Sequence, residues 1–201
     1  MSAVLEAPPD LGVALGLSPE VLARIRPSIV RVRGRGPVGA AGVVWHRDAV
    51  VTNHHVIAGA RLGLRVVGAD GQAHAARVLQ ASRRLDLALL EVPGADLAPA
   101  AIGRSAGLRV GELVFAIGHP WGQPWVVTSG VISGLGSVSV PGHAAAGAYI
   151  RSDVRLAPGN SGGALLDARG QVIGLNAMVV GGDLSVAIPS DVVREWLGQR
   201  P

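Results

Sequence analysis

The chain of 201 residues contains no cysteine. Disulfide bonds, thiolate nucleophiles and cysteine-bound metal sites are therefore excluded. It also contains no lysine, so all 18 basic residues are arginine, which explains a sequence isoelectric point of about 11.1 at a net charge of only +4. The arginines are scattered and are not interleaved with aromatic residues. This distribution argues against a nucleic-acid-binding surface.

Aromatic residues and long apolar runs are also scarce. Only 3% of the residues are aromatic, whereas 49% are hydrophobic and 16% are charged, a balance typical of a folded chain with an aliphatic core. No apolar run approaches the roughly 20 residues of a membrane span. The apolar stretch 11–17 follows no basic residue, unlike the start of a signal peptide. We therefore predict a cytoplasmic protein with no membrane association.

The 29 glycines and 13 prolines separate short, valine-rich segments, many of which alternate apolar and polar residues as half-buried strands do. We predict an all-β fold of two antiparallel six-stranded β-barrels, the first over residues 28–93 and the second over 110–188. Residues 94–109 form the linker between them. An arm and short helix precede the barrels at 1–27, and a C-terminal helix follows at 189–201. The expected strands are 29–33, 42–45, 49–52, 62–67, 75–79, 87–92, 113–117, 126–135, 149–152, 164–167, 172–176 and 184–188.

The segment 158–163, with the sequence PGNSGG, is the strongest candidate for chemistry. A serine hydroxyl is a poor nucleophile until a base removes its proton, and the reaction also needs donors for an oxyanion. Glycines allow a loop to turn its N–H groups outward. We predict Ser161 as nucleophile, with the N–H groups of Gly159 and Ser161 as the oxyanion hole. A polar turn between strands is the alternative.

Two further segments carry a histidine and an aspartate. His55 follows the predicted strand 49–52, and Asp86 directly precedes the apolar segment 87–90, where an unpaired carboxylate is costly. Alone, they could be a surface histidine and a turn residue. Together with Ser161 they predict a triad in which Asp86 binds the Nδ1–H group of His55 and holds its tautomer, in a cleft between the barrels. No acidic residue or histidine lies at zinc-like spacing, so we expect no metal and no cofactor.

Six segments, in order along the chain, resemble the HtrA (high-temperature-requirement, Deg) family of serine proteases. In that family the catalytic histidine directly precedes the aliphatic pair, which selects His55 over His54. The resemblance implies cleavage of unfolded or exposed polypeptides, a preference for small aliphatic residues, and a homotrimer as a possible assembly. We expect a protease domain without a PDZ domain. The matching segments are TNHHV at 52–56, DLALL at 86–90, GHPWG at 118–122, VTSGVIS at 127–133, PGNSGG at 158–163 and AIPSD at 187–191.

The resulting hypothesis is a serine endopeptidase that works through an acyl-enzyme in protein quality control or regulated proteolysis. Leu156 and Ile188 are candidates to line the primary specificity pocket, with core packing as the alternative. His119 is expected to be a loop residue packed on Pro120 or Trp121. Three other functions stay open: a latent or chaperone-like polypeptide-binding module, an esterase or acyl transferase using the same triad, and an arginine-mediated nucleic-acid binder.

Overall fold

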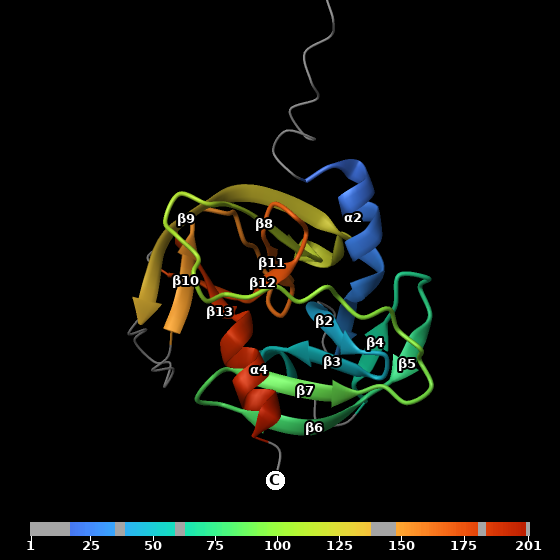
Figure 1. Cartoon of the computed structure of the whole chain (residues 1–201). Coiled ribbons are helices and arrows are strands. Elements are labelled where there is room, and N and C mark those ends of the chain that lie inside the picture. The colour runs from blue at the N-terminus through green and yellow to red at the C-terminus, as the bar shows by residue number, and fades with distance from the viewer. Residues whose placement is uncertain (1–16, 35–38, 59–62, 138–147, 181–183, 200–201) are drawn as a thin grey trace, which may run out of the picture.

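The structure is a computed structural model, and it describes residues 17–34, 39–58, 63–137, 148–180 and 184–199. Its strands form two antiparallel sheets that lie against each other, with the chain passing from the first to the second (Figure 1). The predicted all-β class, with two β-barrel units and a helix at each end, is confirmed. The first unit is an open, curled sheet of seven strands and the second is a closed barrel of six.

The first sheet has the strand order β5-β4-β1-β2-β3-β7-β6. The segment 75–79, predicted as one strand, is the end of β5 and the start of β6. The chain changes direction at Ala76, whose N–H donates to the carbonyl of Leu64 at 3.0 Å. This break accounts for the seventh strand. The strands are β1 (Ile29–Arg33), β2 (Ala40–His46), β3 (Ala49–Thr52), β4 (Arg65–Val67), β5 (Ala73–Ala75), β6 (Arg77–Ser82) and β7 (Leu87–Glu91).

The second sheet closes in the order β10-β13-β12-β11-β8-β9. Closure removes the free strand edges that an open sheet would expose. The long β9 is paired with β8 at one end and with β10 at the other, and so curls around the barrel. The strands are β8 (Leu113–Gly118), β9 (Val126–Ser137), β10 (Ala148–Ser152), β11 (Ala164–Leu166), β12 (Val172–Val180) and β13 (Leu184–Pro189).

The hydrophobic core has three parts, one inside each sheet and one between them. Strand β3 is buried on both faces, so that Val50 packs inside the first sheet and its neighbour Val51 packs in the cluster between the sheets. That central cluster also takes Phe115 and Leu166 from the barrel. Shared packing of this kind holds the two sheets in one arrangement.

Both helices and the connecting segment strengthen this arrangement. Helix α2 (Pro19–Ile25) begins after Ser18, whose hydroxyl accepts the N–H of Val21 at 3.4 Å, and a short 3-10 turn (Arg26–Ser28) leads into β1. Helix α4 (Ser190–Gly198) is tied to the connecting segment by the Ser190 hydroxyl, which donates to the carbonyl of Gly103 at 2.9 Å. No helix in the described part of the chain is long and apolar enough to cross a membrane.

Candidate active site

His55 and Asp86 meet at the end of strand β3. The register pairs Thr52 with Ala88 on β7, so continuing the two strands brings residue 86 opposite the residues that follow β3. There the chain forms a short helix, α3 (His54–Ile57), which the sequence did not predict. Asp86 Oδ2 lies 2.8 Å from His55 Nδ1, and Asp86 Oδ1 accepts the main-chain N–H of His55 at 2.9 Å. Both carboxylate oxygens therefore hold the same histidine.

Asp86 is itself held in an unusual conformation. Its φ angle of 53° is in the left-handed region, which Asp tolerates better than most residues, and only 5% of the residue is exposed. Its carbonyl accepts two hydrogen bonds, from the N–H of His54 at 3.1 Å and from the side-chain amide of Asn53 at 3.1 Å. Asp86 is thus held through its main-chain carbonyl as well as through its carboxylate. Sequence reasoning did not identify Asn53 as part of the site.

The loop between β10 and β11 presents Ser161 through two successive turns. The N–H of Asn160 donates to the carbonyl of Ala157 at 2.9 Å, and the N–H of Gly163 donates to the carbonyl of Asn160 at 2.9 Å. Gly159 has a φ angle of 106° and Gly162 one of 79°, values that glycine adopts at no steric cost. The two glycines let the chain reverse twice within a few residues.

The same turns orient the N–H groups of Gly159 and Ser161. The carbonyl of Pro158 accepts the N–H of Trp121 at 2.9 Å, and in a planar trans peptide the Gly159 N–H then points the opposite way. The carbonyl of Asn160, bonded to Gly163, directs the Ser161 N–H in the same manner. Within the described ranges neither N–H donates a hydrogen bond. Two such donors on one loop can receive an oxyanion.

The side chain of Ser161 is bonded elsewhere. Its hydroxyl donates to the carbonyl of Ala177 on β12 at 3.0 Å. The structure therefore joins His55 and Asp86 by direct hydrogen bonds, whereas the serine hydroxyl is engaged by the main chain of its own barrel. The Ser161 hydroxyl has to leave the Ala177 carbonyl before it can donate to an imidazole.

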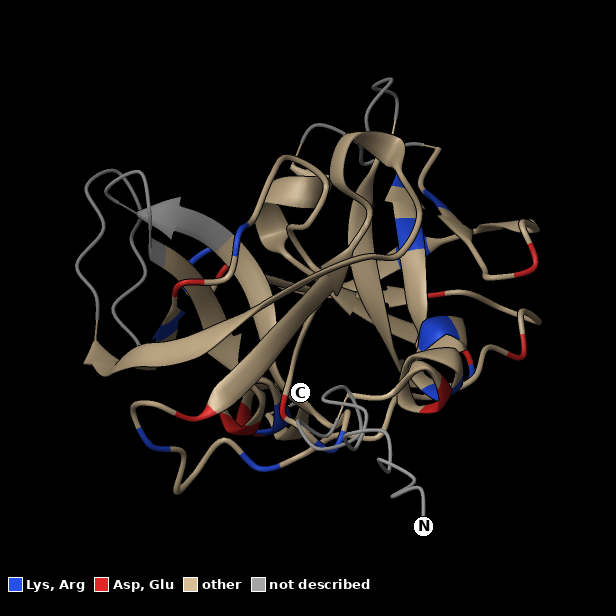
Figure 2. Cartoon of the chain, turned by 90° about the horizontal axis from the view of Figure 1, so that it is seen from above, with Lys and Arg blue, Asp and Glu red and all other residues tan. Residues whose placement is uncertain are grey.

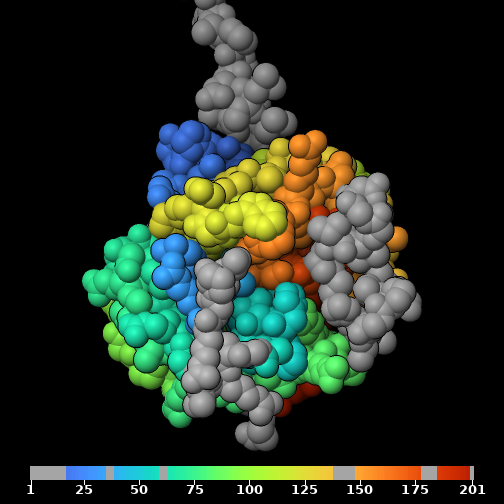
Figure 3. All heavy atoms as spheres, turned by 180° about the vertical axis from the view of Figure 1, so that it is seen from behind, coloured from blue at the N-terminus to red at the C-terminus, as the bar shows by residue number. Residues whose placement is uncertain are grey.

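A backbone bridge connects the serine loop to the first sheet. The N–H of Ala41 on β2 donates to the carbonyl of Ser161 at 2.9 Å, and the buried Thr52 hydroxyl donates to the carbonyl of Ala41 at 2.7 Å. Gly162 lies against this bridge, because a Cβ atom there would be 2.2 Å from both the Ala41 carbonyl oxygen and the Thr52 hydroxyl. On the face drawn in Figure 3, the cyan segment that includes α3, the yellow 120s and the orange 150s lie side by side.

His119 supports the serine loop through a main-chain hydrogen bond. Its main-chain N–H donates to the carbonyl of Gly159 at 3.3 Å, and its Nδ1 accepts the N–H of Trp125 at 3.3 Å. The ring is 1% exposed and stands edge-on to the Trp125 ring. The pKa of His119 is lowered to about 4, chiefly by burial and also by the Arg31 guanidinium, while the carbonyls of Ile29 and Val30 act in the opposite direction. Its ring contact with Trp125 was not foreseen from the sequence.

The two residues predicted to line a specificity pocket have different surroundings. Leu156 is half-buried and packs against the cluster inside the second barrel. Ile188 is 2% exposed and belongs to the core cluster between the sheets. Ile188 thus packs in the core, and the role of both residues in a specificity pocket stays a prediction.

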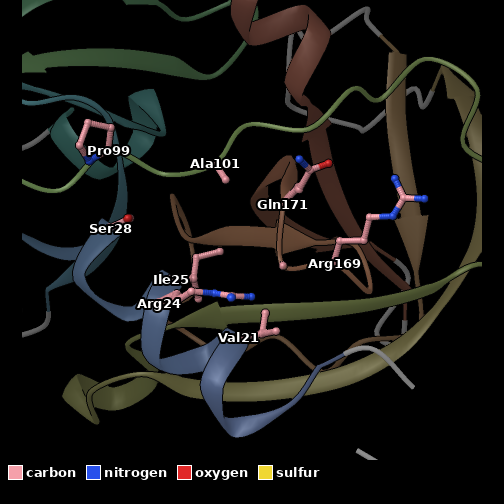
Figure 4. Close-up of a pocket in the computed structure, with 9 residues that line it drawn as sticks. Val21, Arg24, Ile25, Ser28, Pro99, Ala101, Arg169 and Gln171 are labelled. Carbon is pink, nitrogen blue, oxygen red and sulfur yellow. The ribbon is translucent and has the colours of Figure 1, made fainter. Parts of the chain in front are cut away.

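A cavity of about 350 Å³ lies away from the serine loop, between α2, the connecting segment and the β11–β12 turn (Figure 4). Arg24 and Arg169 both line it, but Figure 4 shows their guanidinium groups extending in different directions. In the ribbon of Figure 2 the charged residues are spread over loops, helices and strand ends.

The chain is similar to known peptidases over most of its length. A family model described as a trypsin-like peptidase domain matches residues 40–175. A probable periplasmic serine endoprotease DegP-like from Hahella chejuensis is 37% identical over 83% of this chain and 37% of its own length. Serine protease HTR4 from Bos taurus is 34% identical over 89% of this chain and 40% of its own. The chain thus spans about two-fifths of the length of these curated relatives.

Solved structures give the same picture. The HtrA-type protease AlgW with tripeptide superposes with a TM-score of 0.81 at 31% identity, covering 89% of this chain and 61% of that one. AlgW with decapeptide superposes with a TM-score of 0.80 at 27% identity, covering 89% and 65%. The predicted cytoplasmic location is wrong, because the similar proteins from Hahella chejuensis and from a Marinomonas species are named as periplasmic.

Proposed function

Because this chain belongs to the HtrA-type serine proteases of the trypsin-like peptidase family, we propose that it is a serine endopeptidase acting on unfolded or exposed polypeptides. The observation that carries the proposal is the pair of hydrogen bonds that Asp86 accepts from His55, at 2.8 Å from Nδ1 and at 2.9 Å from the main-chain N–H. A carboxylate bonded at Nδ1 leaves Nε2 as the nitrogen that can accept a proton. This is the arrangement that a general-base histidine requires.

In the proposed mechanism the Ser161 hydroxyl leaves the Ala177 carbonyl and donates to His55 Nε2. Ser161 Oγ then attacks the peptide carbonyl carbon while His55 takes the hydroxyl proton, and Asp86 stabilises the imidazolium. The N–H groups of Gly159 and Ser161 hold the oxyanion. His55 gives its proton to the leaving amine, and a water molecule hydrolyses the acyl-enzyme by the same steps. No cofactor takes part in these steps.

Several finer features belong to the same proposal. Leu156, five residues before Ser161, contributes to the pocket for the side chain that precedes the cleaved bond. Polypeptide substrates are supported by the two AlgW structures, whose names include a bound tripeptide and a bound decapeptide. A homotrimeric assembly and a role in protein quality control or regulated proteolysis are the expectations that the family suggests.

A second candidate function rests on the contact between the Ser161 hydroxyl and the Ala177 carbonyl at 3.0 Å. A serine held in this way is not activated by His55. The protein would then be latent at rest, or would chiefly bind unfolded chains, until a polypeptide or a signal releases the hydroxyl.

Labelling with a fluorophosphonate, followed by intact mass, tests the proposal and separates the two candidates. We expect one adduct on the wild type, none on Ser161→Ala, and an unchanged adduct on Ser133→Ala, which removes an exposed hydroxyl from β9. Hydrolysis of an unfolded polypeptide should follow the same pattern. An adduct that forms only in the presence of unfolded polypeptide would favour the latent enzyme. A labelled and active Ser161→Ala protein would refute the assignment.

A further inference from the structure

One loop donates hydrogen bonds to the main-chain carbonyls of both Pro158 and Gly159. Residues 119–125, which we call the clamp loop, donate the Trp121 N–H to the Pro158 carbonyl at 2.9 Å and the His119 N–H to the Gly159 carbonyl at 3.3 Å. A rotation of the Pro158–Gly159 peptide would replace the N–H group of the proposed oxyanion hole with a carbonyl oxygen. The Trp121 hydrogen bond opposes that rotation, because it would have to break first, and the His119 hydrogen bond holds the adjoining Gly159–Asn160 peptide in place.

The clamp loop is under local strain and needs support of its own. Trp121 has a φ angle of 54° and Trp125 one of 52°, left-handed values that are rare for bulky residues. Such conformations persist only where the surroundings hold them. The indole N–H of Trp125 donates to the carbonyl of Ile29 at 3.1 Å, and the Arg26 guanidinium lies 4.0 Å from the centre of the Trp125 ring. The far end of the loop is thus anchored to the start of β1.

The imidazole of His119 connects the two ends of the clamp loop. Its Nδ1 accepts the main-chain N–H of Trp125, while the His119 carbonyl accepts the N–H of Gly122 at 3.1 Å. An acceptor at Nδ1 requires a neutral ring with its proton on Nε2. Nε2 is buried and has no hydrogen-bond partner in the described part of the chain.

The surroundings of the imidazole favour this neutral form. The Arg31 guanidinium on β1 opposes a positive charge on the ring, and the charged group that borders the Trp125 ring, Arg26, is also positive. Residues 120–125 and 156–163 contribute no titratable side chain. Burial, the main cause, lowers the pKa of His119 to about 4. The ring therefore remains a hydrogen-bond acceptor at neutral pH.

We infer that His119 is a positioning residue for hydrolysis: its neutral imidazole closes the clamp loop, and the clamp loop keeps the Gly159 N–H directed toward the oxyanion. The inference rests on the proposed serine endopeptidase function. It gives a specific role to a residue that does not touch the substrate. Such a residue acts on the transition state, in which the oxyanion exists, more than on substrate binding.

Two substitutions at His119 separate the hydrogen bond from the volume of the ring. H119N places an amide oxygen near the position of Nδ1 and does not titrate. H119L fills the site with an apolar side chain of comparable length and removes the acceptor. H46N, at an exposed histidine on β2, is the matched control. For each protein we would measure kcat and KM on a peptide near pH 7, the fluorophosphonate labelling rate and the Tm.

We expect H119L to lower kcat and the labelling rate by about 10-fold or more, since losing an oxyanion donor costs about 10²–10³-fold in kcat. KM should change by less than about twofold. H119N should recover most of the activity, and H46N should match the wild type. Equal activity of H119L and the wild type would overturn the inference. So would losses in both variants that merely follow the fraction of unfolded protein.

An NMR titration of the wild-type ring keeps the test decisive if H119L does not fold. We expect His119 to stay neutral with its proton on Nε2 until the pH approaches 4. A ring that gains its second proton near pH 6.5, or carries its proton on Nδ1, would overturn the inference. If the wild type labels at Ser161 but fails these tests, only the positioning role is lost. If the wild type neither labels nor cleaves peptides, the proposed function fails and the role of His119 fails with it.

Discussion

The two halves of the candidate site differ in what is already in place. In the first sheet, His55 and Asp86 are bonded side chain to side chain, and Asp86 is held from behind by Asn53 and the N–H of His54. In the second barrel the main chain around Ser161 is equally well bonded, but the serine hydroxyl donates to Ala177. Both halves are thus preorganised in their backbones. The difference between them is the hydrogen-bond acceptor of one hydroxyl, which is the Ala177 carbonyl and not His55.

The halves are also joined asymmetrically. The bridge from Thr52 through Ala41 to the Ser161 carbonyl uses main-chain groups on the serine side and a buried hydroxyl on the histidine side. Thr52 stands three residues before His55, at the end of the strand that positions it. A displacement of the serine loop would therefore be transmitted directly to the end of β3.

Asp86→Asn breaks the first half and has the largest expected effect. Asn tolerates the left-handed backbone, so the loop should keep its shape. An amide nitrogen facing Nδ1 would force the wrong imidazole tautomer, and kcat should fall by about 10³–10⁴-fold. Steady-state kinetics measure this. Asp153→Asn, which alters an exposed carboxylate bonded to the N–H of Val131, should retain activity within a few fold. A loss below about tenfold in Asp86→Asn would contradict the role of the carboxylate.

Gly162→Ala breaks the connection between the halves. The new Cβ atom would meet the Ala41 carbonyl oxygen and the Thr52 hydroxyl at 2.2 Å, at a φ angle of 79°. Backbone strain and overpacking each cost about 1–3 kcal/mol, so the free energy of unfolding should fall by about 3 kcal/mol or more. Denaturant unfolding measures the loss, and labelling of Ser161 should be lost as well.

Gly71→Ala is the matched control for this substitution. Gly71 has a φ angle of 81°, and a Cβ atom there would have no neighbour within 4 Å. Gly71→Ala therefore introduces the same backbone strain without close contacts of the new Cβ atom. Equal losses in the two variants would show that close packing against the bridge is unimportant.

The buried His119 sharpens the comparison through pH. Folding lowers the pKa of its imidazole from 6.5 to about 4, so between these values the unfolded chain binds a proton that the folded protein does not. The free energy of unfolding therefore includes a contribution from the neutral ring that is fully present above pH 6.5 and is lost as the pH falls toward 4. Its upper limit is on the order of 3 kcal/mol.

Unfolding by denaturant near pH 7 and near pH 4.5, on the wild type and on H119N, measures this contribution. The wild type should lose more stability on acidification than H119N, because only the wild type carries the titrating ring. H46N keeps His119 and changes only an exposed residue, so it should behave as the wild type does. Identical losses in the wild type and H119N would contradict the neutral, buried state of His119.

Thr52→Val tests the bridge at the histidine side and has the smallest expected effect. It keeps the branched shape and removes the hydrogen bond to the Ala41 carbonyl, which should lower the free energy of unfolding by about 1–2 kcal/mol. Thr128→Val removes a similar bond, from a half-buried hydroxyl to the carbonyl of the exposed Arg155 at 2.9 Å, and should cost less. Thermal unfolding compares the two. A larger loss at Thr128 would argue that the bridge is not the stronger contact.

Much of the fold could be predicted because short apolar segments with period-two alternation were separated by glycine and proline. Strands β1, β3 and β8 begin and end within about one residue of the predicted segments. The division at Ala76 was missed, since apolar residues continue through it, and the hydrogen bond that marks it is donated by the Ala76 N–H to the carbonyl of Leu64, twelve residues earlier. Helix α3 was missed for a related reason, because four residues carry too little periodicity to recognise.

The candidate site divides in the same way between sequence and tertiary structure. The sequence by itself determined the residue types of the proposed triad, the glycines that let the serine loop reverse, and the membership of a peptidase family, because these depend on local chemistry at short spacing. Only the tertiary structure decided that the Ser161 hydroxyl bonds to Ala177, that Ile188 packs in the core and that His119 closes the clamp loop. The contact of Ser161 with Ala177 forms only when the strands of the second barrel come together, and Ile188 is buried only when the two sheets pack. The contact of His119 with Trp125 needs a loop conformation that the bond from Trp125 to Ile29 holds.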